Sequence, residues 1–308
     1  MKKIMVFGSF VVDLMGRGDH LPSPGETVKA PSFKMGAGGK GFNQAVAAKK
    51  SGAHVVTVTK LGKDEFANVA LNTMKELDMD SSRILYTDKA PTGTALICVD
   101  ENTGQNQIMV IPGACDTITD EEVENLSEVM DECDIVLTQL ETNMTAIEKI
   151  VELAHSKGKT IVLNTAPVQP VTDELLSKID IITPNEVEAS IISGVKVVDE
   201  QSAKRAAEVF KSKNVKNVII TLGANGVFMS TENEEKLIAP IKVKAVDTTG
   251  AGDAFNGGFV TALAEGKSIE EAVKFANCVG ALSVQKIGTT PAMPSRAEID
   301  ELFKKTYR

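Results

Sequence analysis

Residues 247–258 read Asp-Thr-Thr-Gly-Ala-Gly-Asp-Ala-Phe-Asn-Gly-Gly and form the most informative stretch of the 308-residue chain. Helical periodicity resumes from Ala254 to Ala264, so we interpret the stretch as a loop that closes onto a helix N-terminus. Four backbone amides would then point unpaired N–H groups at one spot outside the first turn: Gly250, Ala251, Gly252 and Asp253. The stretch therefore predicts an anion site, favoured by the positive end of the helix dipole.

Asp253, in the first turn of this helix, has two interpretations. A lone aspartate at a helix start more often caps the helix. Inside a glycine-rich anion loop, its carboxylate can also take a proton from a hydroxyl group, beside amides that stabilise the transition-state charge. The loop therefore indicates phosphoryl transfer to an alcohol.

This stretch resembles the C-terminal signature of the ribokinase family of carbohydrate kinases, also called the PfkB family. The other signature of that family is matched about 210 residues earlier, where Gly38-Gly39-Lys40-Gly41 is followed by Asn43 and Gln44. The resemblance covers essentially the whole chain, and within the family it is strongest to kinases of ribose and 2-deoxyribose. It implies one ribokinase-like α/β domain over residues 1–308.

The composition agrees with an enzyme of this kind. A hydrophobic content of 43% is ample for a buried core, and a net charge of −9 disfavours nucleic acid or an anionic membrane as partner. No apolar run approaches the ~18 residues that cross a bilayer. The four cysteines show no CxxC spacing and are expected to be reduced and buried or half-buried: Cys98, Cys115, Cys133 and Cys278. We expect a cytoplasmic protein.

A sustained alternation of strands and helices predicts the fold. The mostly apolar run 3–9 is typical of a central parallel strand that is buried on both faces. Further strands are expected at 55–60, 135–139, 160–163, 180–183, 218–222, 227–229 and 242–246, with helices at 42–51, 64–77, 121–130, 144–156, 202–213 and three after residue 250. This pattern predicts an α/β fold with a mainly parallel sheet and helices on both faces.

Two segments interrupt the alternation. Residues 10–33 contain the turn string 21–27, and two β runs between 92 and 111 flank Glu101-Asn102-Thr103-Gly104 as a hairpin. The two segments can pair into one small sheet. The resemblance implies that insertions at about 11–36 and 92–111 form a lid over a sugar and a surface through which two subunits associate as a homodimer.

Residues 36–41, Gly-Ala-Gly-Gly-Lys-Gly, match the GxGxxG pattern of dinucleotide-binding proteins, and Asp64 follows where a ribose-binding acid would stand. The pattern does not follow the first core strand, so a nicotinamide-dependent dehydrogenase is the weaker alternative. The preferred interpretation is that these glycines let the backbone approach a small sugar, with Lys40 and Asn43 donating to its hydroxyls. A catalytically silent sugar-binding regulator is a third alternative.

Sugar recognition calls for carboxylates, which accept hydrogen bonds from two neighbouring hydroxyls. Asp13 and Glu141 follow predicted strands, where parallel sheets bind ligands, although loop or cap roles fit equally well. The resemblance implies that both bind sugar hydroxyls and that Gly39, Lys40, Gly41 and Asn43 form the substrate loop. Val11 replaces a residue that is commonly polar in the family, and Phe42 a smaller one. An apolar Val11 suits a substrate without one hydroxyl, such as 2-deoxyribose, or packs within the lid.

The nucleotide and metal sites follow from the resemblance. Thr183-Pro184-Asn185-Glu186-Val187-Glu188 resembles the PNxxE motif of the family, which implies that Asn185 and Glu188 help to hold Mg²⁺ and the phosphates. From the residues alone, a helix cap is as consistent. A nucleotide loop with Thr221, Gly223 and Gly226, and Asn277 at the adenine, are also implied. A K⁺ site is expected at Asp247 and Thr249, completed by carbonyls near Ser283, Lys286, Gly288 and Ala292.

The expected reaction is transfer of the γ-phosphoryl group of ATP to the O5 hydroxyl of D-ribose. Asp253 is the expected base, the amides of residues 250–253 hold developing charge, and Mg²⁺ bridges the phosphates. Ribose 5-phosphate and ADP are the products. The alternative acceptors are 2-deoxyribose, another furanose or a nucleoside.

Overall fold

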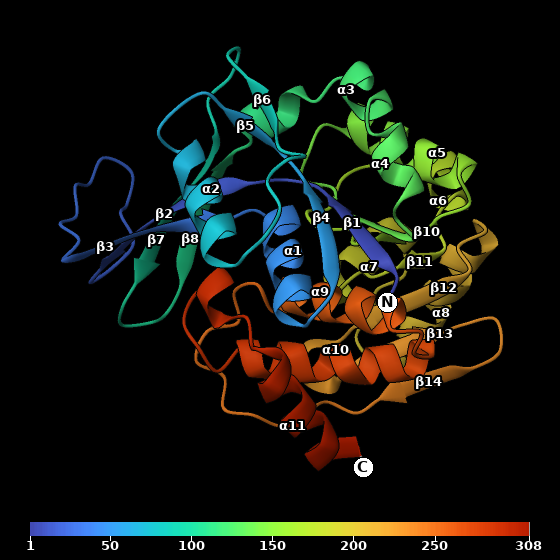
Figure 1. Cartoon of the computed structure of the whole chain (residues 1–308). Coiled ribbons are helices and arrows are strands. Elements are labelled where there is room, and N and C mark those ends of the chain that lie inside the picture. Colours follow the sequence, from blue (N-terminus) through green and yellow to red (C-terminus); the bar gives the residue numbers. More distant parts are fainter. Residues whose placement is uncertain (308) are drawn as a thin grey trace.

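Short runs of β-branched and apolar residues form a central sheet of eight strands in the computed structural model, which describes residues 1–307 (Figure 1). The parallel part comprises β4 (His54–Val58), β1 (Lys3–Phe7), β9 (Ile135–Thr138), β10 (Thr160–Leu163), β11 (Ile181–Ile182) and β12 (Asn217–Thr221), in that spatial order. Two antiparallel strands, β13 (Val227–Ser230) and β14 (Glu235–Ile238), continue the sheet beyond β12. The predicted mainly parallel α/β fold is confirmed.

Helices cover both faces of this sheet. Ile4 and Val6 of β1 pack into one hydrophobic cluster and Met5 and Phe7 into another, as alternation along a strand requires. The first cluster contains residues of α1 (Lys40–Lys50), α2 (Ala67–Glu76), α9 (Ala251–Ala264), α10 (Ile269–Ser283) and α11 (Arg296–Tyr307). The second contains residues of α3 (Asp120–Glu124), α4 (Ser127–Asp131), α5 (Met144–Ser156), α6 (Asp173–Ser177), α7 (Glu186–Ser193) and α8 (Glu200–Ser212).

The two interrupting segments pair into a separate four-stranded sheet, as expected. Its order is β3 (Ser32–Gly38), β2 (Val11–Gly18), β7 (Gly93–Asp100) and β8 (Asn106–Ile111). The β2–β7 pair is parallel and the other two pairs are antiparallel. This small sheet projects from one side of the molecule, at the left of Figure 1, and β2 begins four residues after β1 ends.

Three expectations about the elements are wrong in detail. Residues 242–246 form no strand; the last strand is β14, whose turn is closed by the amide of Thr231 donating to the Glu234 carbonyl. The helix expected at 121–130 is broken into α3 and α4. The strand expected at 55–60 divides into β4 and β5 (Lys60–Gly62), and β5 pairs with β6 (Leu85–Thr87). Cys98 is exposed, whereas the other three cysteines are buried, and all four are free.

Candidate active site

The predicted anion loop lies at the start of α9. Gly250, the residue before the helix, has φ 75°, a left-handed conformation that favours glycine. The amide of Ala251 donates to the Thr248 carbonyl at 3.2 Å, so one of the four amides expected to be unpaired is used. Within residues 1–307 the amides of Gly250, Gly252 and Asp253 have no protein acceptor. Three amides at a helix N-terminus therefore remain to bind an anion.

Two side chains of the first turn of α1 donate hydrogen bonds to the Asp253 carboxylate. Asn43 Nδ2 donates to Oδ2 of Asp253 at 3.1 Å, and Gln44 Nε2 donates to Oδ1 at 3.0 Å. The side chain is only 7% exposed. Burial raises the pKa of the Asp253 carboxyl, while the charge of Lys40 and the two amide donors oppose the rise. The side chain is thus a buried carboxylate that two neutral donors orient, and it does not cap α9.

The glycines of residues 39–41 serve contacts within the protein. Gly39 has φ 89°, and a Cβ atom there would lie 2.8 Å from the Phe10 Cα and the Val11 amide. A Cβ at Gly41 would lie 2.6 Å from the backbone of Gly8 and Ser9. These two glycines therefore let α1 approach the segment after β1 closely. The dinucleotide-binding alternative loses its context, because this motif joins β3 of the small sheet to α1.

Asp13 and Glu141 lie near enough to Asp253 for the charges of the three carboxylates to interact. Glu141 Oε2 accepts from the Lys40 amide at 2.7 Å and from the Ser9 hydroxyl. Burial, together with the nearby negative charges of Glu141 and Asp253, raises the pKa of Asp13 to about 6. A Cβ at Gly38 would lie 2.5 Å from the Asp13 Cγ, so glycine makes room for this carboxylate.

Lys40 supplies the positive charge of the site. Burial lowers the pKa of its ammonium group, but Asp253, Glu141 and Glu188 outweigh that effect and the net pKa is raised. Lys40 therefore lies among carboxylates predicted for the sugar, such as Glu141, and for the phosphates, such as Glu188.

Asn185 and Glu188 form a capping box at the start of α7. Asn185 Oδ1 accepts from the Val187 and Glu188 amides at 2.9 and 2.8 Å, and Glu188 Oε2 accepts from the Asn185 amide at 3.0 Å. Glu188 Oε2 also accepts from the Thr165 hydroxyl at 3.0 Å, and burial raises the pKa of this carboxyl. The helix cap that the residues alone suggested for this motif is thus confirmed. Among residues 1–307 no group of three or more His, Cys, Asp or Glu side chains forms a metal cluster.

The predicted nucleotide loop lies next to this capping box. The Thr221 amide donates to the Pro184 carbonyl at 3.0 Å, which joins the end of β12 to the start of α7. Gly223 and Gly226 bound the short turn after β12, with φ 53° and 98°. Asn277 Nδ2 donates at 3.4 Å to the carbonyl of Ala239, the residue that directly follows β14.

The segments expected to hold K⁺ come together. Asp247 Oδ1 accepts from the Thr249 amide and Oδ2 from the Gly288 amide, both at 2.9 Å. The carbonyl of Ser283 accepts from the Lys286 amide at 3.2 Å. Ala292 ends the short turn η3 (Thr290–Ala292), four residues after Gly288. The aspartate thus bridges the loop before α9 to the loop after α10.

The sequence interpretation assigned no role to several residues of the site. Gln44 was only part of a signature, and Ser9 and Asn164 carried no site prediction. Gln44 stands next to Asn43 at the N-terminus of α1, which is the one signal that was available. Asn164 follows β10 directly, where side chains of a parallel sheet gather.

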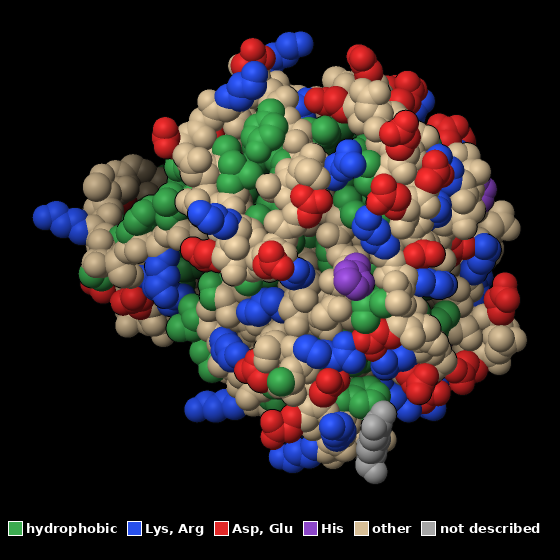
Figure 2. Space-filling model, viewed as in Figure 1, with side chains coloured by type: hydrophobic (Ala, Val, Ile, Leu, Met, Phe, Trp, Pro, Cys, Tyr) green, Lys and Arg blue, Asp and Glu red, His purple; other side chains and the backbone are tan. Residues whose placement is uncertain are grey.

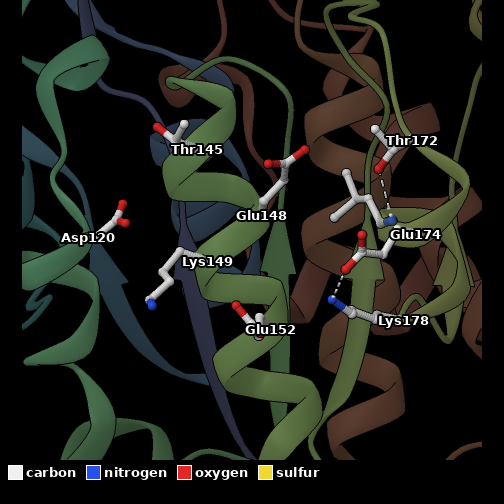
Figure 3. A pocket seen from close by; sticks show the side chains of 9 residues that line it. Asp120, Thr145, Glu148, Lys149, Glu152, Thr172, Glu174 and Lys178 are labelled. Atoms are coloured by element: carbon white, nitrogen blue, oxygen red, sulfur yellow. Dashed lines mark hydrogen bonds and ion pairs between the residues drawn. The ribbon is translucent and has the colours of Figure 1, made fainter.

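Two surface hollows lie away from these residues. One, of about 480 Å³, lies between α5 and α6 and is lined mainly by charged side chains, including the Glu174–Lys178 ion pair (Figure 3). Asp120, Thr145, Glu148, Lys149, Glu152, Thr172 and Leu175 complete its lining. The other is lined by residues of α8, β13 and β14. Neither contains a predicted site residue. Within residues 1–307 no helix has the length and apolar character needed to span a membrane.

Comparisons with known proteins agree with this geometry. The profile of the pfkB family of carbohydrate kinases matches residues 1–296. Ribokinase of Haemophilus influenzae is 41% identical over 303 residues, which cover 98% of this chain and 99% of that protein. Deoxyribokinase of Salmonella typhi is 35% identical, with 97% of each chain covered. The structure of Arabidopsis thaliana ribokinase complexed with ribose and ATP aligns with a TM-score of 0.89 at 30% identity, over 98% of this chain and 99% of that one.

Proposed function

Because the chain belongs to the pfkB family of carbohydrate kinases, we propose that it transfers the γ-phosphoryl group of ATP to the O5 hydroxyl of D-ribose. The products are ribose 5-phosphate and ADP. The observation that carries the proposal is the Asp253 carboxylate, which Asn43 and Gln44 hold beside three free amides of the α9 N-terminus. Full-length similarity to ribokinases at about 40% identity supports ribose as the acceptor.

In this reaction Asp253 accepts the proton of the O5 hydroxyl as that oxygen attacks phosphorus. The amides of Gly250, Gly252 and Asp253 stabilise the charge that develops on the phosphoryl oxygens, and Lys40 neutralises part of it. Asp13 and Glu141 accept hydrogen bonds from the remaining hydroxyls and fix the direction of O5. The small sheet, whose strand β2 carries Asp13, acts as a lid that excludes water.

Mg²⁺ bound to the ATP phosphates supplies neutralisation of phosphate charge. Asn185 and Glu188 fit this ion through water, because the capping box already uses their side-chain oxygens. Thr221, Gly223 and Gly226 form the loop beside the nucleotide, and Asn277 lines the adenine. Asp247 and the carbonyls of residues 283–292 would hold a K⁺ ion, which would order the anion loop.

The second candidate acceptor is 2-deoxyribose. Val11 is 4% exposed and packs with Ala95, Ile97 and Val99 of β7, so it offers no hydrogen bond to a sugar hydroxyl. The 35% identity to a deoxyribokinase supports the same alternative. The ratio of kcat/KM for ribose to that for 2-deoxyribose, in the wild type and in Val11→Asn, distinguishes the two. A rise of that ratio in the variant assigns Val11 to specificity, and an unchanged ratio assigns it to packing alone.

A second copy of the chain covers the outer face of the small sheet. Cross-strand neighbours there expose apolar side chains, and Phe33 is 67% and Met109 64% exposed. Met35, Leu96 and Ile111 extend this face, and Figure 2 shows hydrophobic side chains gathered over the small sheet. Monomers rarely expose apolar patches of this kind. Light scattering of Met109→Asp, which is expected to be monomeric, tests the homodimer.

The four free cysteines and the acidic composition support a cytoplasmic location.

The decisive experiment follows ADP release with ribose and Mg-ATP. Asp253→Ala is expected to lower kcat by about 10³-fold or more while circular dichroism remains that of the wild type. Asp88→Ala, at an exposed aspartate outside the site, is the matched control. An Asp253→Ala enzyme within about tenfold of the wild type would refute the role of the base. Tight sugar binding without any ADP release would favour the silent regulator.

A further inference from the structure

Three buried side-chain amides form a hydrogen-bonded network that ends on the Asp253 carboxylate. Gln44 is fully buried, Gln139 is 1% exposed and Asn164 is 6% exposed. Gln44 Nε2 donates to Asp253 Oδ1 and to Asn164 Oδ1, each at 3.0 Å. Gln44 Oε1 accepts from Gln139 Nε2 at 2.8 Å. Both protons of the Gln44 amide nitrogen and its oxygen are therefore engaged.

One backbone atom, the carbonyl oxygen of Thr183, fixes which group donates and which accepts in every hydrogen bond of this network. Asn164 Nδ2 donates to the Thr183 carbonyl at 2.9 Å, and a carbonyl can only accept. Asn164 must therefore turn its oxygen toward Gln44, so Gln44 must present its nitrogen there. The same nitrogen is then the one that reaches Asp253. A Gln44 amide rotated by half a turn would place its oxygen against both a carboxylate and a carbonyl.

Gln139 is kept in one orientation even though its own bonding is incomplete. Its Oε1 is buried and has no partner within residues 1–307, while its Nε2 donates to Gln44. A side chain at position 8 would overlap this oxygen, so Gly8 leaves the space that Gln139 occupies. An unpaired buried oxygen is unfavourable. Its presence indicates that the donation to Gln44 is the contact that this residue serves.

At its other end, this hydrogen-bonded network joins α9 to Thr183, the residue that follows β11. The Thr183 hydroxyl donates to Asn256 Oδ1 at 2.6 Å, and Asn256 Nδ2 donates to the Gly252 carbonyl at 2.9 Å. The residue that anchors Asn164 thus also holds the first turn of the helix that carries Asp253. Asp253 and its supporting amides are fixed to the same point of the central sheet.

We propose that Gln44 is a positioning residue that fixes the Asp253 carboxylate in the orientation for proton transfer, and that Gln139 and Asn164 hold Gln44 in its one productive orientation. The proposal rests on the proposed function, because it takes Asp253 as the base. Donation to Oδ1 restrains rotation of the carboxylate and leaves Oδ2, beside Asn43, for the acceptor hydroxyl. It also favours the ionised carboxylate, together with Lys40 and against the charges of Asp13 and Glu141.

Gln44→Met, of similar volume but without a donor, tests the proposal. We expect kcat to fall by about 10²-fold with the KM values of sugar and ATP within about threefold of the wild type, because the change misplaces the base without touching either substrate. The acid limb of kcat against pH is expected to move to higher pH. Gln139→Met does not touch Asp253 and is expected to lower kcat by about tenfold through Gln44. Gln201→Met, at an exposed glutamine of α8, is the matched control.

The outcomes separate the two proposals. If Gln44→Met keeps kcat within about threefold of the wild type and its acid limb unmoved, while Asp253→Ala loses about 10³-fold, Gln44 positions nothing and the kinase proposal stands. If Asp253→Ala itself retains turnover, the base is wrong and both proposals fail. If Gln44→Met does not fold, as judged by circular dichroism, Gln139→Met decides: unchanged kcat and acid limb overturn the positioning role, and a parallel change of both supports it.

Discussion

The contact between α1 and α9 sets where Asp253 lies relative to its two amide donors, and Gly257→Ala is the change that tests this dependence. A Cβ at Gly257 would lie 2.7 Å from the Ala48 amide nitrogen and the Gln44 carbonyl oxygen, and would also overlap the Ala47 Cβ. Ordinary van der Waals contact with a Cβ begins at 3.4 Å. The two helices must therefore separate, by roughly 1 Å.

That separation lengthens the bonds from Asn43 and Gln44 to Asp253, now 3.1 and 3.0 Å, beyond the range of a hydrogen bond. Overpacking costs about 1–3 kcal/mol, and the weakened bonds to a charged group add about 1.5–3 kcal/mol. Alanine in a helix returns about 0.5–1 kcal/mol relative to glycine. We expect a net loss of about 3 kcal/mol, or roughly 5 °C in Tm for a chain of this length. Displacement of the base by about 1 Å is expected to lower kcat by about 10²-fold.

Thermal melts and steady-state kinetics of two neighbouring variants separate stability from catalysis. Gly258 is adjacent on α9 but faces α10, where its Cβ would lie 2.5 Å from Val279 Cγ2. Gly258→Ala is expected to lower Tm while kcat per folded molecule stays within about threefold of the wild type. Gly280→Ala, whose nearest foreign atom is 3.7 Å away, is expected to leave both unchanged or to raise Tm. A Gly257→Ala enzyme with lowered Tm and unchanged kcat would refute the idea that helix spacing positions the base.

Three further predictions concern the acceptor and cation sites. The folded-state pKa of Asp13, about 6, lies above its ordinary value of 3.8, so ionisation of Asp13 destabilises the folded ligand-free protein as pH rises through 4 to 6. Asp13→Asn is therefore expected to raise stability at pH 8 by up to roughly 3 kcal/mol but not at pH 3.5, while sugar binding is lost; equal melting shifts at the two pH values would contradict this. Gly38→Ala is expected to raise the sugar KM by about tenfold or more and to leave the ATP KM unchanged in initial-rate assays, because its Cβ would displace the Asp13 carboxylate. Replacing K⁺ by choline is expected to slow the wild type and to leave Asp247→Ala unaffected; equal wild-type rates in both salts would exclude the cation site.

The order of core elements was predictable because buried parallel strands are apolar on both faces. β9 and β10 begin at the residues expected from the sequence, Ile135 and Thr160, and each contains a run of three apolar residues. The strand β14 was missed because Glu235 and Lys236 are exposed at the sheet edge and carry no apolar signal. Residues 242–246 have the β-branched composition of a strand but no neighbouring strand to pair with. Strand propensity predicted an extended segment, but it does not show whether another strand lies beside it to complete the pairing.

The carboxylates of the site were predictable for a related reason. Glu141 follows β9, and the carboxyl ends of parallel strands converge whatever the loops between them do. Asp13 was expected after the first strand but lies within β2, which begins four residues after β1 ends. The contacts of Gln44 were not predictable, because they join α1 to residues 139, 164 and 253 through side-chain orientations that only the folded structure defines. Gly39 and Gly41 were predicted to need small size, but the surface that requires it, the backbone of residues 8–11, was not.

Neutral amide donors to Asp253 are consistent with the role of base that we propose for it. A direct ion pair with lysine or arginine would orient the carboxylate but would also lower its pKa by one unit or more, which weakens it as a proton acceptor. Within residues 1–307 no such cation forms an ion pair with Asp253; its partners are the neutral amides of Asn43 and Gln44. Lys40 acts on Asp253 through its field alone, and burial opposes that effect. The Asp253 carboxylate is thus oriented by neutral donors, as the proposed base requires, and in the proposed reaction the charge of Lys40 acts on the phosphate.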